Sequence, residues 1–269
     1  MSAPVITFLS DFGLDDWFVG VVHGVMLEVC PTAKIVDVSH AIPPGDVARA
    51  SFVLEAAAPD FPAGTIHAAV VDPGVGTQRR GLAVRAHGQL FVGPDNGVLE
   101  WAFQDPAAEI RSLTDARYFR EPVSRTFHGR DVFGPVAAHL ARGVELATLG
   151  PPVTDPVRAP RRPATAVPGL VLGQVMLVDR FGNALTNVTA ELLARGFPGA
   201  DESQLEIELC GRRIRGLSRS YGDSPVGQLV ALIGSSGRLE VAQVGGHAAS
   251  RLGAGLGDPV TVRRVDQAR

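Results

Sequence analysis

The chain is poor in cysteine and has no long hydrophobic run, and each absence excludes a class of protein. Its two cysteines, Cys30 and Cys210, are far apart and lack the C-x-x-C or histidine spacing of a zinc site, so we expect buried, reduced thiols. No segment approaches the about 20 apolar residues of a membrane helix. No basic region precedes the first apolar run, as it would in a secretion signal. We therefore expect a soluble, cytoplasmic protein.

Basic clusters and the common nucleotide-binding motifs are also absent. The net charge of -3 argues against a general nucleic-acid surface, because phosphate binding depends on clustered lysines and arginines. The chain has neither the G-K-[ST] of a Walker A loop nor a G-x-G-x-x-G before a helix. What is present is apolar: 45% of the 269 residues are hydrophobic, enough for one large or two ordinary globular domains.

Residues 1–155 alternate apolar, β-branched runs with amphipathic segments, which predicts an N-terminal α/β domain with a mostly parallel central sheet. Asp15 or Asp16 is expected to cap the first helix, and Asp46 the second. His87-Gly88 is expected to turn a hairpin. Strands are predicted at 5–9, 34–40, 66–72, 82–85 and 90–93, and helices at 17–29, 47–58, 98–103 and from 127 onward.

The second half of the chain has a different character. Prolines crowd residues 151–168, so we expect residues 156–168 to be an extended linker without a regular element. Short apolar runs then follow one another with one short helical segment at 190–195, which predicts a small β-barrel or β-sandwich over residues 169–269. The predicted strands are 173–179, 205–209, 228–233, 239–244 and 259–265.

The segment 65–80 delivers an acid from a buried strand into a Pro/Gly turn. Asp72 would lie at the carboxyl end of an inner strand, the sheet edge at which open α/β sheets bind ligands. Gly74 and Gly76 allow a sharp turn, and Arg79 follows at a distance that lets its guanidinium fold back toward Asp72. An ordinary strand-to-loop turn with a capping aspartate explains this segment, taken alone, equally well.

Other polar residues follow the ends of neighbouring elements. Asp11 follows the first strand, where a carboxylate commonly holds a ribose diol. His128 lies at a helix start, where the helix dipole favours a neutral ring that can accept or relay a proton, although a structural role is common there. His40, at a strand end, is more typical of a structural hydrogen bond than of a ligand contact, and Asp95-Asn96 is more typical of a turn.

Two polar, glycine-bearing loops in the second half could hold a planar ligand. They cover residues 179–187 and 235–240. Phe181 and Tyr221 are candidates for the aromatic plane against which such a ligand would stack.

Five of these segments, taken together and in order, resemble the S-adenosylmethionine hydroxide adenosyltransferase family. Relatives of that family fluorinate or chlorinate the same substrate, displacing methionine. The resemblance extends over nearly the whole chain, and five segments in register are far more specific than any one of them. They are residues 10–13 (SDFG), 71–76 (VDPGVG), 93–97 (GPDNG), 127–131 (FHGRD) and 181–183 (FGN).

The resemblance implies an enzyme that hydrolyses S-adenosyl-L-methionine to adenosine and methionine, with no metal or other cofactor. It implies an α/β domain and a β-barrel domain in a homotrimer, with the substrate between neighbouring subunits. Asp72, Arg79 and His128 would prepare the attacking water. Asp11 would hold the ribose, Asp179 the methionine ammonium, and Phe181 and Tyr221 the adenine faces, while Asn183, Ser235, Ser236, Glu240 and Val244 would contribute further substrate contacts, chiefly to the adenine edge.

The charge of Asp72 favours water over halide as the attacking group. A carboxylate can take a proton from water, whereas it would repel an anionic nucleophile that the halogenating relatives hold among neutral donors. Gly129 nevertheless resembles the chlorinating relatives. Three alternatives remain: a chlorinase-like halogenase, a non-catalytic sensor of S-adenosylmethionine or adenosine, and a metal site formed by Asp11, Asp72 and His128. The resemblance also suggests the unwanted R sulfonium epimer as substrate, a choice that the sequence alone leaves open.

Overall fold

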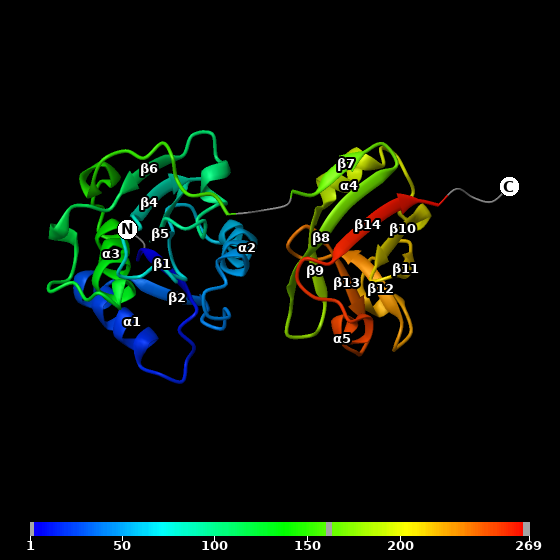
Figure 1. The fold of residues 1–269 in the computed structure, drawn as a ribbon, viewed down its shortest axis with the longest axis horizontal. Coiled ribbons are helices and arrows are strands. Elements are labelled where there is room, and N and C mark those ends of the chain that lie inside the picture. Colours follow the sequence, from blue (N-terminus) through cyan, green and yellow to red (C-terminus); the bar gives the residue numbers. More distant parts are fainter. Residues whose placement is uncertain (1–2, 160–162, 266–269) are drawn as a thin grey trace. The chain divides into compact units, whose positions relative to one another are not determined.

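The computed structural model describes residues 3–159 and 163–265. The chain divides into two compact units, residues 1–160 and 161–269 (Figure 1). Each unit has hydrophobic clusters of its own.

The N-terminal unit is built on a six-stranded sheet with the order β2-β1-β3-β5-β4-β6. The first four of these strands run parallel, whereas β4 is antiparallel to both of its neighbours. This confirms the prediction of a mostly parallel sheet. The strands are β1 (Val5–Ser10), β2 (Lys34–Ser39), β3 (Ile66–Val70), β4 (Gly81–Ala86), β5 (Gln89–Pro94) and β6 (Glu109–Ser112).

Helices cover both faces of this sheet, α1 and α3 on one and α2 on the other (Figure 1). The alternation of side chains along β1 illustrates why: Ile6 and Phe8 pack toward α1 and α3, whereas Leu9 packs toward α2. Within the described part of the chain, the helices are too short or too polar to cross a bilayer. The helices are α1 (Phe18–Val29), α2 (Val47–Ala57) and α3 (Gly134–Ala141), and a π-helical turn (Gly129–Phe133) leads into α3.

The helix-start predictions were partly right. Asp46 caps α2 as expected, its side chain accepting from the Arg49 amide at 3.0 Å. The prediction for Asp15 or Asp16 was wrong, because α1 begins after Trp17 and has no side-chain cap. The helix expected at 98–103 is also wrong: turns lead only to a 3-10 segment (Ala102–Gln104). Pro106 accounts for the end of this segment at Gln104, because a proline disfavours the helical conformation in the preceding residue, and Asp105 is extended.

Two smaller predictions have opposite outcomes. The β4–β5 hairpin turns at His87-Gly88 as expected, with φ of +51° and +73°, the left-handed pair typical of a tight hairpin. Neither cysteine forms a disulfide, but only Cys30 is buried. Cys210 is exposed because it lies at the turn that joins β10 to β11, with φ of +49°.

The C-terminal unit is a nearly closed antiparallel barrel with the strand order β11-β10-β14-β8-β9-β13-β12, and β7 pairs with β8. At the remaining gap, the Ser218 amide donates to the Ala231 carbonyl at 2.8 Å. The elements are β7 (Thr165–Val167), β8 (Leu170–Val178), β9 (Ala184–Thr189), α4 (Ala190–Gly196), β10 (Leu205–Leu209), β11 (Arg212–Arg215), β12 (Leu229–Ile233), β13 (Arg238–Gln243), α5 (Ala248–Leu252) and β14 (Pro259–Arg264).

Strand β7 corrects the expectation that residues 156–168 contain no regular element. Thr165, Ala166 and Val167 lie between two prolines and keep the backbone amides that antiparallel pairing with β8 requires. Pro160, Arg161 and Arg162 of the expected linker lie outside the described residues. Strand β9 likewise begins inside the segment 179–187, which was expected to be a loop.

Candidate active site

The candidate acids Asp11 and Asp72 follow two adjacent strands, β1 and β3. Strands β1 and β3 are parallel neighbours with Ser10 opposite Val70, so Asp11 and Asp72 follow the same edge of the sheet. One oxygen of Asp11, Oδ2, accepts a 2.8 Å hydrogen bond from the Gly45 amide. Gly45 can present this amide because its φ of +73° lies in the left-handed region.

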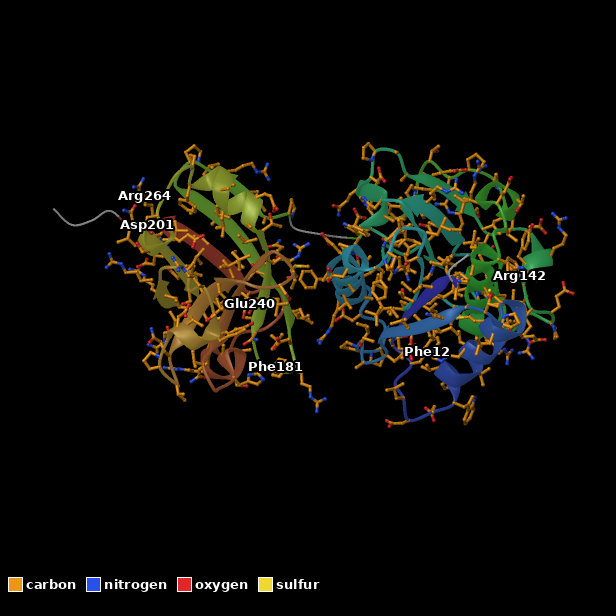
Figure 2. The ribbon with its side chains drawn as sticks, turned by 180° about the vertical axis from the view of Figure 1, so that it is seen from behind. Phe12, Arg142, Phe181, Asp201, Glu240 and Arg264 are labelled. Atoms are coloured by element: carbon orange, nitrogen blue, oxygen red, sulfur yellow. The ribbon has the colours of Figure 1, made fainter. Side chains whose placement is uncertain are left out.

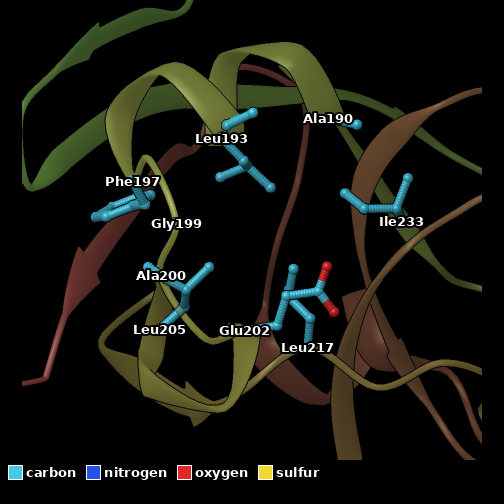
Figure 3. Close-up of a pocket in the computed structure, with 10 residues that line it drawn as sticks. Ala190, Leu193, Phe197, Gly199, Ala200, Glu202, Leu205, Leu217 and Ile233 are labelled. Carbon is cyan, nitrogen blue, oxygen red and sulfur yellow. The ribbon is translucent and has the colours of Figure 1, made fainter.

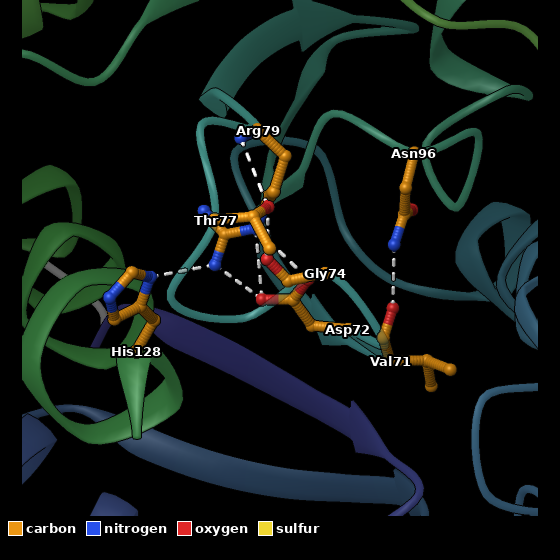
Figure 4. Close-up of polar contacts among 7 residues, drawn as sticks. All are labelled: Val71, Asp72, Gly74, Thr77, Arg79, Asn96 and His128. Atoms are coloured by element: carbon orange, nitrogen blue, oxygen red, sulfur yellow. Dashed lines mark hydrogen bonds and ion pairs between the residues drawn. The ribbon is translucent and has the colours of Figure 1, made fainter. Parts of the chain in front are cut away.

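Asp72 and Arg79 form a bidentate ion pair (Figure 4). Arg79 Nε lies 2.9 Å from Oδ1 and 3.0 Å from Oδ2 of Asp72, and Arg79 Nη2 donates to Oδ2. Their side chains are only 13% and 6% exposed, and the Arg79 guanidinium also lies 5.1 Å from the centre of the Phe133 ring. Low exposure and two-point contact fix the carboxylate in one orientation. The expectation that Arg79 folds back onto Asp72 is confirmed.

The loop that makes this contact depends on its glycines. Gly76 has φ of +77°, and a Cβ built there would lie 2.3 Å from the Arg125 carbonyl oxygen. Thr77 Oγ1 donates to the Gly74 carbonyl at 2.7 Å and closes the turn. Asn96 accepts from the Val98 amide through Oδ1 at 3.1 Å, which is the turn-forming role that its sequence favoured. Its Nδ2 also donates to the Val71 carbonyl at 2.8 Å, next to Asp72 (Figure 4).

His128 completes the cluster from the other side of Arg79. Its Nδ1 lies 2.7 Å from Arg79 Nη2 (Figure 4). Because a guanidinium has only donors, Nδ1 must accept, and the neutral ring carries its proton on Nε2. Burial, reinforced by the positive charge of Arg79, lowers the pKa of His128 below its ordinary value of 6.5. The expected neutral ring is thus explained by burial and a neighbouring cation.

The charge arrangement argues against a metal ion held by Asp11, Asp72 and His128. The Arg79 guanidinium contacts both Asp72 and His128, and it would repel a second cation at that position. What the arrangement offers is a fixed carboxylate beside a guanidinium and a neutral imidazole. Such a set can take a proton from a water molecule and stabilise negative charge that develops on its oxygen.

In the C-terminal unit, Asp179 organises its own loop. Its Oδ1 accepts from the Phe181 amide at 2.9 Å and the Asn183 amide at 2.8 Å, and its Oδ2 accepts from Asn183 Nδ2 at 3.1 Å. Phe181 is held by its backbone, but the residue is 77% exposed, and Figure 2 shows it at the surface of this unit. An exposed ring on a fixed backbone is suited to stack on a planar ligand.

Tyr221 and Glu240 form a second polar pair close to this loop. The Tyr221 hydroxyl donates to Glu240 Oε1, and Glu240 is 5% exposed. Burial raises the pKa of both groups, and the Asp179 charge adds to both increases. In the pairing of β13 with β9, Glu240 lies opposite Leu185 and Val241 opposite Ala184, so Glu240 is next to the loop that Asp179 organises. The structure therefore brings together Asp179, Phe181, Asn183, Tyr221 and Glu240.

The remaining candidates of this unit are less closely associated. Ser235 and Ser236 lie in the turn between β12 and β13, next to Gly234, where a Cβ would meet Glu240 Oε2 at 2.4 Å. Val244 follows β13 and packs in a separate small apolar cluster with residues of β12 and β13. Its expected substrate contact has no support from this geometry.

A pocket of about 240 Å³ opens elsewhere in the C-terminal unit (Figure 3). Leu193 of α4, Phe197 directly after it, Leu205, Leu217 and Ile233 give it a mainly apolar lining, and Glu202 is the acidic residue among them. None of the candidate site residues lines it. Its volume is below the roughly 300–1,000 Å³ usual for small-molecule sites.

Comparison with known proteins gives matches over both units. Family models described as the SAM hydroxide adenosyltransferase N-terminal and C-terminal domains match residues 6–150 and 173–261. The chain is 42% identical to a protein of Salinispora arenicola named (R)-S-adenosyl-L-methionine hydrolase, with 97% of this chain and 98% of that protein covered. It is 29% identical to a fluorinase of Actinoplanes sp., over 89% and 91% of the two chains.

A solved structure has the same fold. An uncharacterized conserved protein from Thermotoga maritima superimposes with a TM-score of 0.91 at 35% sequence identity. The superposition covers 96% of this chain and all of that one.

Proposed function

The chain belongs to the SAM hydroxide adenosyltransferase family, and from this premise we propose that it hydrolyses S-adenosyl-L-methionine to adenosine and L-methionine. The R sulfonium epimer is the proposed substrate, since the hydrolase name of the 42% identical relative specifies it. The observation that supports the proposal is the buried Asp72–Arg79 pair, in which the carboxylate is held in one orientation and can serve as a base for a water.

The proposed reaction is a direct displacement at the 5′ carbon of the ribose. The water oxygen bonds to this carbon as the carbon–sulfur bond breaks, and methionine leaves as a neutral thioether. A sulfonium is already an excellent leaving group, so the main requirement is a nucleophile held in line. Asp72 takes the proton that the water loses, and Arg79 orients Asp72 and stabilises hydroxide character. His128 holds Arg79 in place through Nδ1.

Substrate binding is assigned to residues of both units. Asp11 has committed Oδ2 to the Gly45 amide, and its other oxygen is proposed to hold the ribose hydroxyls. Phe181 and Tyr221 are proposed to stack on adenine, with Asn183, Ser235, Ser236 and Glu240 at its edge. Asp179 is proposed to meet the methionine ammonium while keeping its loop hydrogen bonds.

We propose further that the working enzyme is a homotrimer with sites shared between neighbouring subunits. The candidate residues fall into one set on residues 1–160 and another on residues 161–269. A substrate with a nucleoside and an amino-acid part needs both sets, and a ring of subunits can supply one set from each of two neighbours.

The decisive experiment compares Asp72→Asn with Asp11→Asn, using each sulfonium epimer and identifying the products by chromatography. Because a general base contributes at least about 100-fold to rate, we expect Asp72→Asn to lose about that factor in kcat and to keep adenosine affinity. Asp11→Asn should instead raise KM and leave kcat little changed. Normal turnover by Asp72→Asn would remove the base assignment.

The same assay separates the competing functions. Chloride or fluoride should not divert the product from adenosine; a halogenated nucleoside would identify a halogenase. Tight binding of both epimers without turnover would identify a sensor.

A further inference from the structure

Away from the candidate active site, three side chains of the N-terminal unit direct metal-ligating atoms toward one another. His23 Nε2 lies 2.8 Å from Asp37 Oδ1, and His40 Nε2 lies 3.0 Å from the same oxygen. All three ligand atoms lie within 4.8 Å of one another. We propose that this cluster binds one divalent transition-metal ion, with Zn²⁺ as the best match.

The spacing and the ligand types both fit zinc. Zinc lies about 2.1 Å from histidine nitrogens and carboxylate oxygens, so ligand atoms around a tetrahedral ion are roughly 3.4 Å apart. Small side-chain rotations would bring the three atoms to that spacing. Two imidazoles and one carboxylate suit zinc better than Mg²⁺ or Ca²⁺, which prefer oxygen ligands. The side chains of His23 and Asp37 are 26% and 39% exposed, so an ion can reach them from solvent.

His40 provides a second, independent observation. Its side chain is 2% exposed, and within the described part of the chain its Nε2 is buried without a hydrogen bond. On the other side of the ring, Nδ1 lies 2.7 Å from Ser10 Oγ. When Nδ1–H donates to Ser10, the bare Nε2 lone pair faces the negative Asp37 oxygen, which is repulsive without a cation. A ring that binds metal through one nitrogen and donates through the other is the usual arrangement for a histidine ligand.

A metal-free hydrogen-bonded cluster explains only part of this geometry. It accounts for His23, whose Nε2 hydrogen-bonds to Asp37. With the His40 proton on Nε2, this atom would face Asp37 Oδ1 at 3.0 Å but in a geometry that makes no hydrogen bond, so a metal-free cluster leaves it poorly satisfied. The Phe8 ring, 4.8 Å from the His40 ring and 5.9 Å from the His23 ring, forms an apolar wall behind both histidines. Zinc ligands are commonly held in such a shell.

A bound ion would connect elements that meet close to Asp11. His23 lies on α1, and Asp37 lies on β2. The His40 carbonyl accepts from the Gly13 amide at 2.9 Å, and its ring contacts Ser10, so His40 braces both ends of the segment that contains Asp11. The ion is thus proposed as a structural brace, separate from the displacement chemistry.

The test is calorimetric titration of Zn²⁺ into the full-length chain after dialysis against a chelator. We expect one Zn²⁺ per chain and a rise in melting temperature on binding. His23→Ala and Asp37→Asn should each weaken Zn²⁺ affinity at least about tenfold. His139→Ala is the matched control, because His139 is a partly buried histidine of α3 outside the cluster, and its loss should leave affinity unchanged.

Three outcomes would overturn the proposal. The first is no binding heat and no change in melting temperature at millimolar Zn²⁺, a concentration far above that needed for an about 1 μM site. The second is equal affinity in His23→Ala and the unmodified chain, which would place the ion elsewhere. The third concerns the unmodified chain alone: Co²⁺ should show the absorption of nitrogen-ligated cobalt, and the spectrum of the hydrated ion would contradict the site even if a variant failed to fold.

Discussion

Arg79 is the residue that holds the candidate site together. Its guanidinium contacts both oxygens of Asp72, the Nδ1 of His128 and the face of Phe133. Only a planar, forked cation can satisfy these directions at once, so a lysine at this position would keep the charge and lose the geometry. The neutral state of His128 follows from the same contact, because a nearby positive charge disfavours a second one.

The protonation of His128 can be measured directly. Its pKa should lie below the ordinary 6.5, and Arg79→Gln should raise it by removing the repelling charge. NMR titration of the imidazole resonances reports both values. Arg80→Gln is the control, because Arg80 pairs with Asp95 and Asp155, so this change should leave the pKa of His128 unaltered.

The lowered pKa of His128 also determines how folding stability depends on pH. The unfolded chain binds the His128 proton more strongly than the folded chain, so this residue's contribution to stability is lost as pH falls below about 6.5. An NMR value at or above 6.5, or no response to Arg79→Gln, would contradict this account.

At this scale the sequence could predict contacts that are local in the chain. Asp72 and Arg79 share one loop, so spacing and a glycine turn were enough to expect their pairing. The contact of His128 with Arg79 spans 49 positions, and no local pattern encodes it. The zinc cluster was missed for the same reason: His23 belongs to a helix and Asp37 to the following strand, and only the packing of α1 on the sheet brings them together.

Among the elements, the loop between β3 and β4 is the most constrained part of the candidate site. Gly76→Ala should destabilise the fold by more than the about 1–2 kcal/mol of a left-handed alanine, because its Cβ would also collide with the Arg125 carbonyl. Gly64→Ala is the matched control: its φ is +80°, with nothing within 4 Å of an added Cβ. Chemical denaturation measures the free energy of unfolding of both variants. Equal decreases would show that the loop shifts to accommodate the added methyl group, which would contradict this prediction.

Helices and strands were predicted correctly where the local pattern of side chains matches the conformation that the backbone adopts. The β-branched runs of β1 and β3 and the Asp46 cap are local signals of this kind. Strand β9 gave no such signal, because one of its inward-facing residues, Thr186, is polar and interrupts the apolar alternation typical of a strand. Its hydroxyl can be buried because it donates to the Leu239 carbonyl at 2.7 Å. Strand β11 was missed because three of its four residues are exposed arginines that pair along the barrel edge.

For the whole molecule, mixing two differently impaired variants tests the proposed shared site. Asp72→Asn disables one unit, and Phe181→Ala, which removes an exposed ring, weakens the other. Co-assembled at equal amounts and assayed at low substrate, they should regain activity in about a quarter of the sites, if each site joins two subunits of a ring. Asp72→Asn mixed with Asp11→Asn, both in residues 1–160, should not recover. Absence of recovery in the first mixture would place each site within one chain.

Each of the two units has hydrophobic clusters of its own, and this has a consequence for how this family can change over evolutionary time. Because each unit packs its own hydrophobic residues, we expect a substitution that destabilises one unit to leave the packing of the other unchanged, so that the two units can accumulate mutations independently. On the proposed assignment, a lineage can exchange the attacking species through changes confined to residues 1–160, while the grip on the nucleoside is inherited unaltered. Hydrolases and halogenating enzymes can then diverge from one ancestor through a series of variants that all remain folded.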